Sequence, residues 1–238
     1  RGLLLLALCS CSSAPEELDW PVDQPGQHAV GFTRRPMQYT TQEGEQRSLQ
    51  IVVWYPASAP EGPGVSYLEA YERPDVHQGA PAIDRALGTL VWSHGSLAFP
   101  EASGFMGEYL ASHGWVVLAP EHVDNTIRDI GVGVDVDTYS WRPQDVSATL
   151  DWWLARDAND PLVPLVDERA AVGGHSFGGY TALVATGASF SKTVADCDAG
   201  LRSGWCNGLA ADNFARFEQG VTDDRFAASI LYNSGGGD

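Results

Sequence analysis

Basic side chains are scarce in this sequence of 238 residues. Lysine and arginine together number 14 against 31 aspartate and glutamate residues, so the formal net charge is −17 at pH 7. A protein that binds nucleic acid needs a positive field to displace the counterions of the phosphate backbone. The charge balance therefore argues against a nucleic-acid partner, although it selects neither a fold nor a reaction.

Long hydrophobic runs are missing from the start of the chain. The apolar residues 3–8 follow Arg1 and are too few to span a bilayer. They resemble the tail of a signal peptide whose basic region has been lost, because no Met begins the chain. We expect a signal-peptide remnant at residues 1–11, a polar leader at residues 12–28 and the folded domain at residues 29–238.

This start of the chain predicts export from a bacterial-type cell. The segment from Leu8 to Cys11 resembles a lipoprotein cleavage box, in which a small residue precedes the cysteine that receives lipid. Cys11 fits that position better than Cys9, which follows the bulky Leu8. Under the first interpretation, the protein is a periplasmic or outer-membrane lipoprotein that is attached to the membrane by its lipid anchor. The alternative is an ordinary secretory signal with incidental cysteines, and both interpretations export the protein.

Cysteine is rare, with four residues in the chain. Cys197 and Cys206 lie nine positions apart in a glycine-rich, polar stretch, and export permits a disulfide between them. Neither a CxxC pair nor a nearby histidine accompanies them. We therefore expect a disulfide in preference to a metal site.

Short β-branched runs alternate with helical periodicity, and this alternation predicts an α/β fold. The expected strands are residues 49–55, 89–92, 115–119, 170–172 and 226–232, and the expected helices are residues 101–113 and a segment that begins near Pro143. The runs at 89–92 and 115–119 are almost continuously apolar, which is typical of central parallel strands. Residues 56–88 are rich in proline and glycine and predict a long excursion.

The strand expected at residues 170–172 leads directly into the sequence Gly-His-Ser-Phe-Gly. A G-x-S-x-G pattern between an apolar strand and a helix is typical of a nucleophile elbow. Ser176 would occupy a strained turn, and Gly174 and Gly178 would allow the neighbouring backbone to approach closely. The helix that begins behind Phe177 would direct its amide groups toward an oxyanion forming at Ser176. A chance glycine-rich turn is the alternative, and the strand–turn–helix context favours catalysis.

A second motif, His94-Gly95-Ser96, follows the strand expected at residues 89–92. The backbone N–H groups of Ser96 and Phe177 would then converge on one developing negative charge. We expect His94 to stabilise the turn and His175 to order the elbow. Neither is expected to act as a base, since enzymes with this elbow carry the base later in the chain.

Four segments in order resemble the plasma-type platelet-activating-factor acetylhydrolases and their bacterial dienelactone-hydrolase-like relatives. They are residues 89–99, 110–114, 119–124 and 174–179. The resemblance covers about Ile51 to Tyr232. It implies an α/β-hydrolase fold with a mostly parallel central sheet and flanking helices. It also implies Ser176 as nucleophile, the amides of Ser96 and Phe177 as oxyanion donors, and ester hydrolysis without a metal or cofactor.

No histidine follows Ser176, whereas the triad of this fold runs serine, acid, histidine. The six histidines lie at positions 28, 77, 94, 113, 122 and 175. Where the acetylhydrolases carry their acid, this chain has Asn233, and an amide cannot stabilise an imidazolium as a carboxylate does. Asp238 and a residue beyond the end are the candidates for the acid. We expect missing C-terminal strands and a nearly inactive fragment, with His122 the first candidate base should the chain prove active.

These features predict an exported serine carboxylic ester hydrolase that acts through an acyl-enzyme on Ser176. Its substrate would be a small-molecule or lipid ester, and the acyl chain and alcohol would depend on loops such as residues 56–88 and 191–224. A polyester or cutinase-like hydrolase would use the same machinery on a polymer. The alternative from another class is a non-catalytic binding module that kept the fold and lost its histidine.

Overall fold

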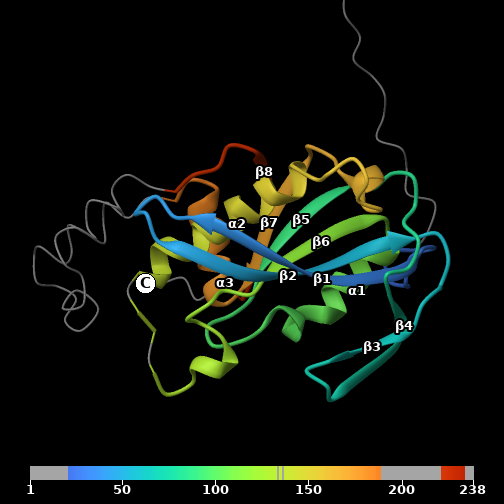
Figure 1. Ribbon diagram of the computed structural model, residues 1–238, viewed down its shortest axis with the longest axis horizontal. Coiled ribbons are helices and arrows are strands. Elements are labelled where there is room, and N and C mark those ends of the chain that lie inside the picture. The colour runs from blue at the N-terminus through green and yellow to red at the C-terminus, as the bar shows by residue number, and fades with distance from the viewer. Residues whose placement is uncertain (1–20, 133, 136, 189–220, 234–238) are drawn as a thin grey trace, which may run out of the picture.

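The computed structural model describes residues 21–132, 134–135, 137–188 and 221–233 (Figure 1). In this part of the chain, eight strands form one sheet in the order β3-β4-β1-β2-β6-β5-β7-β8. The strands are β1 (Ala29–Thr40), β2 (Gln46–Ala57), β3 (Gly64–Tyr67), β4 (Tyr71–Gln78), β5 (Gly88–Ser93), β6 (Trp115–Pro120), β7 (Ala170–His175) and β8 (Phe226–Tyr232). The helices are α1 (Gly104–Ser112), α2 (Thr138–Leu154) and α3 (Phe177–Ala185), with 3₁₀ turns at Pro100–Ser103, Ile127–Asp129 and Val163–Leu165.

The strands β6, β5, β7 and β8 run parallel, while β2 pairs antiparallel with both β1 and β6. The predicted α/β class, with a mostly parallel sheet and flanking helices, is confirmed. All six residues of β5 are buried, as expected of a central strand covered on both faces. At the edge, Ile230, Leu231 and Tyr232 of β8 are exposed. Because these four strands are parallel, the carboxyl ends of β5, β6, β7 and β8 lie together at one end of the strands. We call this end the carboxyl edge of the sheet.

Two apolar cores lie on opposite faces of the sheet. Side chains alternate along β2, so that Ile51, Val53 and Tyr55 pack into the core shared with α2 and α3. Val52 and Trp54 pack into the core that includes residues of α1. This alternation follows from the two-residue period of a strand, and Figure 1 shows the helices on the two sides of the sheet.

Residues 56–88, which we expected to form a long excursion, include two strands. They contain the hairpin of β3 and β4, which extends the sheet beyond β1 through the pairing of Val30 with Val76. Val65 and Tyr67 of the hairpin are buried against the α1-side core. These few apolar positions lie between exposed polar residues, so the local pattern is too weak to predict two strands.

Two other element boundaries differ from the sequence pattern. Strand β2 continues through Pro56 to Ala57, beyond Trp54, the last residue of β2 that pairs with β6. Helix α2 begins before Pro143, which therefore lies inside it. A proline has no N–H to donate to the preceding turn, and the carbonyl of Tyr139 instead accepts a long hydrogen bond of 3.4 Å from the Tyr180 hydroxyl. Strand β1 has no counterpart among the predicted strands.

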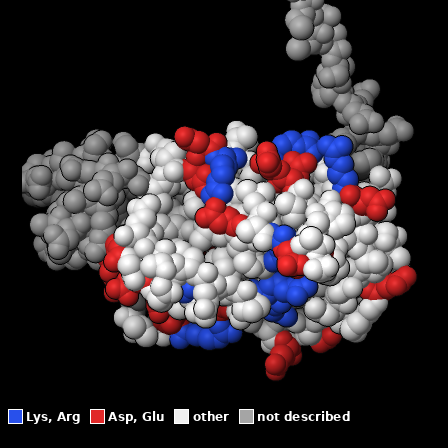
Figure 2. All heavy atoms as spheres, turned by 45° about the horizontal axis from the view of Figure 1, so that its top comes forward, with Lys and Arg blue, Asp and Glu red and all other residues white. Residues whose placement is uncertain are grey.

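Surface arginines lie beside carboxylates. Arg34 pairs with Glu101 at 2.6 Å, and Arg169 pairs with Asp167 at 2.8 Å. Figure 2 shows basic side chains close to acidic ones on one face of the molecule, with other residue types forming most of that face. Exposed pairs of this kind contribute little stability, but in each pair the carboxylate neutralises the charge of the arginine beside it.

The Tyr67 hydroxyl should anchor the β3–β4 hairpin. It accepts a hydrogen bond from Trp54 Nε1 at 2.7 Å and donates to Glu108 at 2.8 Å. Tyr67→Phe leaves the buried indole N–H unpaired, so we expect it to lower the free energy of unfolding by about 1–3 kcal/mol. Tyr71→Phe is the matched control, because Tyr71 lies in the same hairpin with 63% of its surface exposed. Urea unfolding that shows equal stability for the two variants would contradict this role.

Candidate active site

Ser176 occupies the tight turn between β7 and α3. Its backbone has φ 53° and ψ −117°, a conformation that L residues rarely adopt. Its N–H donates to the carbonyl of Tyr232 at 3.1 Å, and its carbonyl accepts from the N–H of Gly179 at 2.9 Å. The end of β8 and the first turn of α3 thus hold the strained residue from both sides, and its side chain is only partly buried.

The two glycines of the motif allow backbone segments to touch. A Cβ atom on Gly174 would lie 2.2 Å from the carbonyl of Gly178. A Cβ atom on Gly178 would lie 1.9 Å from the carbonyl oxygen of Ser93 at the end of β5. Because the obstructing atoms are backbone, no side-chain movement relieves the clash. Gly174 is therefore required to close the turn itself, and Gly178 is required for the turn to lie against the end of β5.

The loop after β5 lies against this turn. A Cβ atom on Gly95 would lie 3.7 Å from Ser176 Cβ and 3.2 Å from His175 Nδ1. Ser96 is exposed, and its Oγ accepts a hydrogen bond from Asn125 Nδ2 at 3.2 Å. The structure therefore brings the His94-Gly95-Ser96 loop and the serine turn together at the carboxyl edge of the sheet.

In the described part of the chain, four of the six non-glycine residues with positive φ lie along this edge, and the other two, Leu68 and Glu69, lie in the turn between β3 and β4. Non-glycine residues with positive φ follow the ends of β5, β6, β7 and β8 within four positions in each case. They are Leu97, Asp124, Ser176 and Asn233. Strained residues persist only where the surrounding structure over-determines them, and they cluster at functional sites. A residue of this kind after each of the four strands is thus a further indication that the function lies at this edge.

A buried serine, histidine and aspartate lie directly behind the loop. His122 Nε2 lies 2.8 Å from Ser93 Oγ, and His122 Nδ1 lies 2.8 Å from Asp145 Oδ2. Asp145 also accepts from Arg47 Nε at 2.8 Å and from the Tyr39 hydroxyl at 2.6 Å. Ser93, His122 and Asp145 are completely buried, so this arrangement has the composition of a catalytic triad but no access for a substrate.

The charge states follow from these contacts. Burial lowers the pKa of His122 well below its ordinary value, and the positive charges of Arg142 and Arg47 lower it further. Burial also lowers the pKa of His94, with a further contribution from Arg142. Both imidazoles are therefore neutral at pH 7. Burial raises the pKa of Asp145, and the ion pair with Arg47 opposes that shift.

The histidines in the described part of the chain have structural contacts. His94 Nδ1 lies 2.7 Å from the carbonyl of Gly95, and His94 Nε2 accepts from the N–H of His122 at 3.1 Å. The ring of His175 packs against that of Tyr232, with 5.5 Å between centroids. Both ring nitrogens of His122 are engaged by Ser93 and Asp145. His122, our first candidate base, therefore has no nitrogen to offer Ser176, and that hypothesis is wrong for this conformation.

Sequence reasoning missed the buried polar group around Arg142 and Asp145. The one available signal was the spacing of these charged residues, at positions i and i+3 in a helix with an apolar face, which places both on one side.

Four predicted residues lie outside the described part of the chain: the lipidation site Cys11, the cysteines Cys197 and Cys206 and the candidate acid Asp238. Within the described ranges, no group of three metal-ligating side chains occurs, and no helix is long and apolar enough to cross a membrane.

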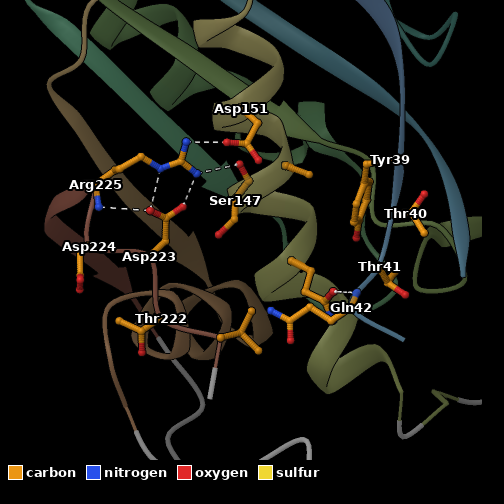
Figure 3. A pocket seen from close by; sticks show the side chains of 13 residues that line it. Tyr39, Thr40, Thr41, Gln42, Ser147, Asp151, Thr222, Asp223, Asp224 and Arg225 are labelled. Atoms are coloured by element: carbon orange, nitrogen blue, oxygen red, sulfur yellow. Dashed lines mark hydrogen bonds and ion pairs between the residues drawn. The ribbon is translucent and has the colours of Figure 1, made fainter. Parts of the chain in front are cut away.

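A separate hollow of about 530 Å³ lies between α2, the end of β1 and the segment before β8 (Figure 3). Figure 3 shows the Arg225 guanidinium between the carboxylates of Asp223 and Asp151. The N–H of Asp223 donates to the carbonyl of Ala185, the last residue of α3. Because Ser176 precedes the first residue of α3, this hollow lies at the opposite end of that helix from the serine turn.

The sheet order, the parallel strands and the strained serine between β7 and α3 define an α/β-hydrolase fold. The solved structure of a ferulic acid esterase from Streptomyces cinnamoneus matches this chain with a TM-score of 0.55 and 22% sequence identity. The match covers 68% of this chain and 56% of that chain, so this chain spans little more than half of that esterase. No protein-family model and no curated protein matches the sequence. The narrower resemblance to platelet-activating-factor acetylhydrolases stays a prediction.

Alanine should lower the free energy of unfolding much more at Gly178 in the turn than at Gly95 in the loop. Gly178→Ala places Cβ against the Ser93 carbonyl, and we expect a loss of about 3 kcal/mol or more, at the upper end for overpacking. Gly95→Ala meets the movable side chain of His175 and should cost less than about 1 kcal/mol. Urea unfolding measures both, and equal losses would contradict the backbone contact.

The neutral buried histidines predict a loss of stability in mild acid. The unfolded chain binds protons at His94 and His122 near the ordinary pKa of 6.5, whereas the folded chain does not. Stability is therefore complete above pH 6.5 and falls below it, by up to about 1.4 kcal/mol per pH unit for each histidine. Burial also lowers the pKa of His28, so it contributes to the same slope. His122→Gln should reduce the slope between pH 6.5 and 5.5 by up to about 1.4 kcal/mol per pH unit. Equal slopes for the wild type and the variant would exclude His122 as a titrating group.

Proposed function

We propose that this protein is an exported serine ester hydrolase of the acetylhydrolase-like type. The observation that carries the proposal is Ser176 in a strained turn beside the Gly95-Ser96 loop, at the carboxyl edge of a parallel sheet. The likeness to a solved esterase supports the fold on which this site is built. Export rests on residues 1–11 and is part of the same proposal, with or without lipid on Cys11.

In the proposed reaction, Ser176 Oγ attacks the carbonyl carbon of an ester, and the carbonyl oxygen gains negative charge. The N–H of Phe177, at the start of α3, and the N–H of Ser96 donate hydrogen bonds to that oxygen. Collapse of the intermediate expels the alcohol and leaves an acyl group on Ser176, which water then releases. The described residues supply the nucleophile and the oxyanion donors. A general base takes the Ser176 hydroxyl proton during the attack and returns it to the leaving alcohol oxygen.

Ser176→Ala in the full-length protein should abolish hydrolysis of a short p-nitrophenyl ester. Loss of a triad serine costs on the order of a million-fold in kcat in another serine hydrolase. Ser58→Ala is the control, because Ser58 is exposed and bonded only to the carbonyl of Pro81 among the described residues. Circular dichroism and Tm should not change in either variant, since alanine has the same backbone constraints as serine at this position.

A fluorophosphonate probe gives a second measurement of the same proposal. The wild-type protein should be labelled on Ser176 alone, since only an activated serine reacts quickly. Activity above a few per cent in Ser176→Ala, or a label on another serine, would refute the assignment. A full-length protein that neither turns over esters nor reacts with the probe would support the non-catalytic binding module instead.

A further inference from the structure

The guanidinium of Arg142 lies between the two segments that carry the proposed oxyanion donors. Arg142 belongs to α2, far in sequence from both segments, and it is completely buried. It contacts neither Ser176 nor an open surface in the described part of the chain. What it does contact is the loop after β5 and the first turns of α3.

The contacts to the loop hold it at both ends. Arg142 Nη2 donates to Ser93 Oγ at 2.9 Å and to the carbonyl of His94. Arg142 Nη1 donates to Asn125 Oδ1 at 2.6 Å. Asn125 in turn donates from Nδ2 to Ser96 Oγ at 3.2 Å. The side chain therefore fixes Ser93 and His94 directly and Ser96 through one intermediate.

The contacts to α3 involve the residue that follows the nucleophile. Arg142 Nε donates to Thr181 Oγ1 at 3.2 Å, and Thr181 Oγ1 lies 3.0 Å from the carbonyl of Phe177. The guanidinium carbon also lies 4.6 Å from the centroid of the Phe177 ring, within the range of a cation–π contact. One planar group thus reaches both segments that carry the proposed donors.

Packing alone does not account for a charged group at this position. In the described part of the chain, Arg142 forms no ion pair, and its four hydrogen-bond acceptors are neutral. Burial of a charge without a direct counter-ion costs several kcal/mol, and an apolar side chain of similar volume would fill the space at lower cost. A guanidinium offers several donors in a rigid plane, and here they join β5, the loop and α3.

We propose that Arg142 is the positioning residue of the oxyanion hole, which holds the loop at residues 93–96 against the start of α3 so that the amides of Ser96 and Phe177 face one point. The inference rests on the proposed function. Because the amides bind the oxyanion more strongly than the ground-state carbonyl, misalignment should act on kcat and much less on KM.

The test compares Arg142→Lys with Arg156→Lys in the full-length protein. Lysine keeps the positive charge of Arg142 but not its fork of donors. Arg156 is the matched control because it is also largely buried, stacks on Trp152 with 3.7 Å to the ring centroid, and bonds to Asp160. Arg142→Lys should lower kcat for a p-nitrophenyl ester by about 100-fold and change KM by less than about threefold, as for loss of an oxyanion donor. Arg156→Lys should leave both constants within about twofold, since it removes no contact to the donors.

Two further measurements separate positioning from general loss of structure. A trifluoromethyl ketone, which forms an oxyanion on the nucleophilic serine, should bind Arg142→Lys more weakly by about the same factor as the loss in kcat. Amide hydrogen exchange should accelerate in the loop at residues 93–99 and in the first turn of α3, and not in β1 or β2. If Arg142→Lys does not fold, Asn125→Ala decides. It removes the link to Ser96 together with one Arg142 hydrogen bond, and it keeps the Arg142 contacts to Ser93, His94 and Thr181. It should lower kcat by about tenfold.

A kcat for Arg142→Lys within about threefold of the wild type would overturn the inference. So would equal losses in the two lysine variants, accelerated exchange across the whole sheet, or an unchanged kcat in Asn125→Ala. Failure of the proposed function is seen separately and first, as a wild-type protein that neither hydrolyses esters nor reacts with the fluorophosphonate probe.

Discussion

The contact between the end of β5 and the serine turn is the constraint on which the rest of the site depends. The carbonyl oxygen of Ser93 occupies the space that a Cβ atom of residue 178 would take. Glycine at this position lets the β5 loop and the start of α3 approach to backbone distance. Two sets of amide groups from distant parts of the chain can then lie near one serine side chain.

Close approach alone does not set the direction of those amide groups. Backbone contact brings the segments together, and a buried polar network sets their orientation. The network runs from Arg47 through Asp145, His122 and Ser93 to Arg142. It links the first part of β2, α2, the segment after β6 and the end of β5, so the strained edge of the sheet is tied to the β1–β2 hairpin and to α2. In a medium of low dielectric constant, every member of such a network needs a partner, and partial satisfaction is costly.

The same network explains why a serine, a histidine and an aspartate at hydrogen-bond distance are here part of the core. Asp145 is held by Arg47 and Tyr39, and Ser93 accepts from Arg142. Ser176, by contrast, is partly exposed, follows a strand end and precedes a helix. Exposure and backbone geometry, and not the identity of three side chains, distinguish the candidate nucleophile from the buried serine.

The class of fold, the parallel strands and the turn at Ser176 could be predicted from the sequence, because each depends on neighbouring residues. An apolar run predicts β5, β6 or β7, and glycines at positions 174 and 178 predict the elbow. The β3–β4 hairpin could not be predicted from the sequence. Its few buried residues, such as Tyr67, are covered only when they pack against Trp54, which belongs to another strand. Only the tertiary structure decided the role of Arg142, whose partners Ser93 and Thr181 lie 49 and 39 positions away along the chain. Local patterns record which face of an element is buried, whereas the partner of a buried charge is set by segments that meet only after folding.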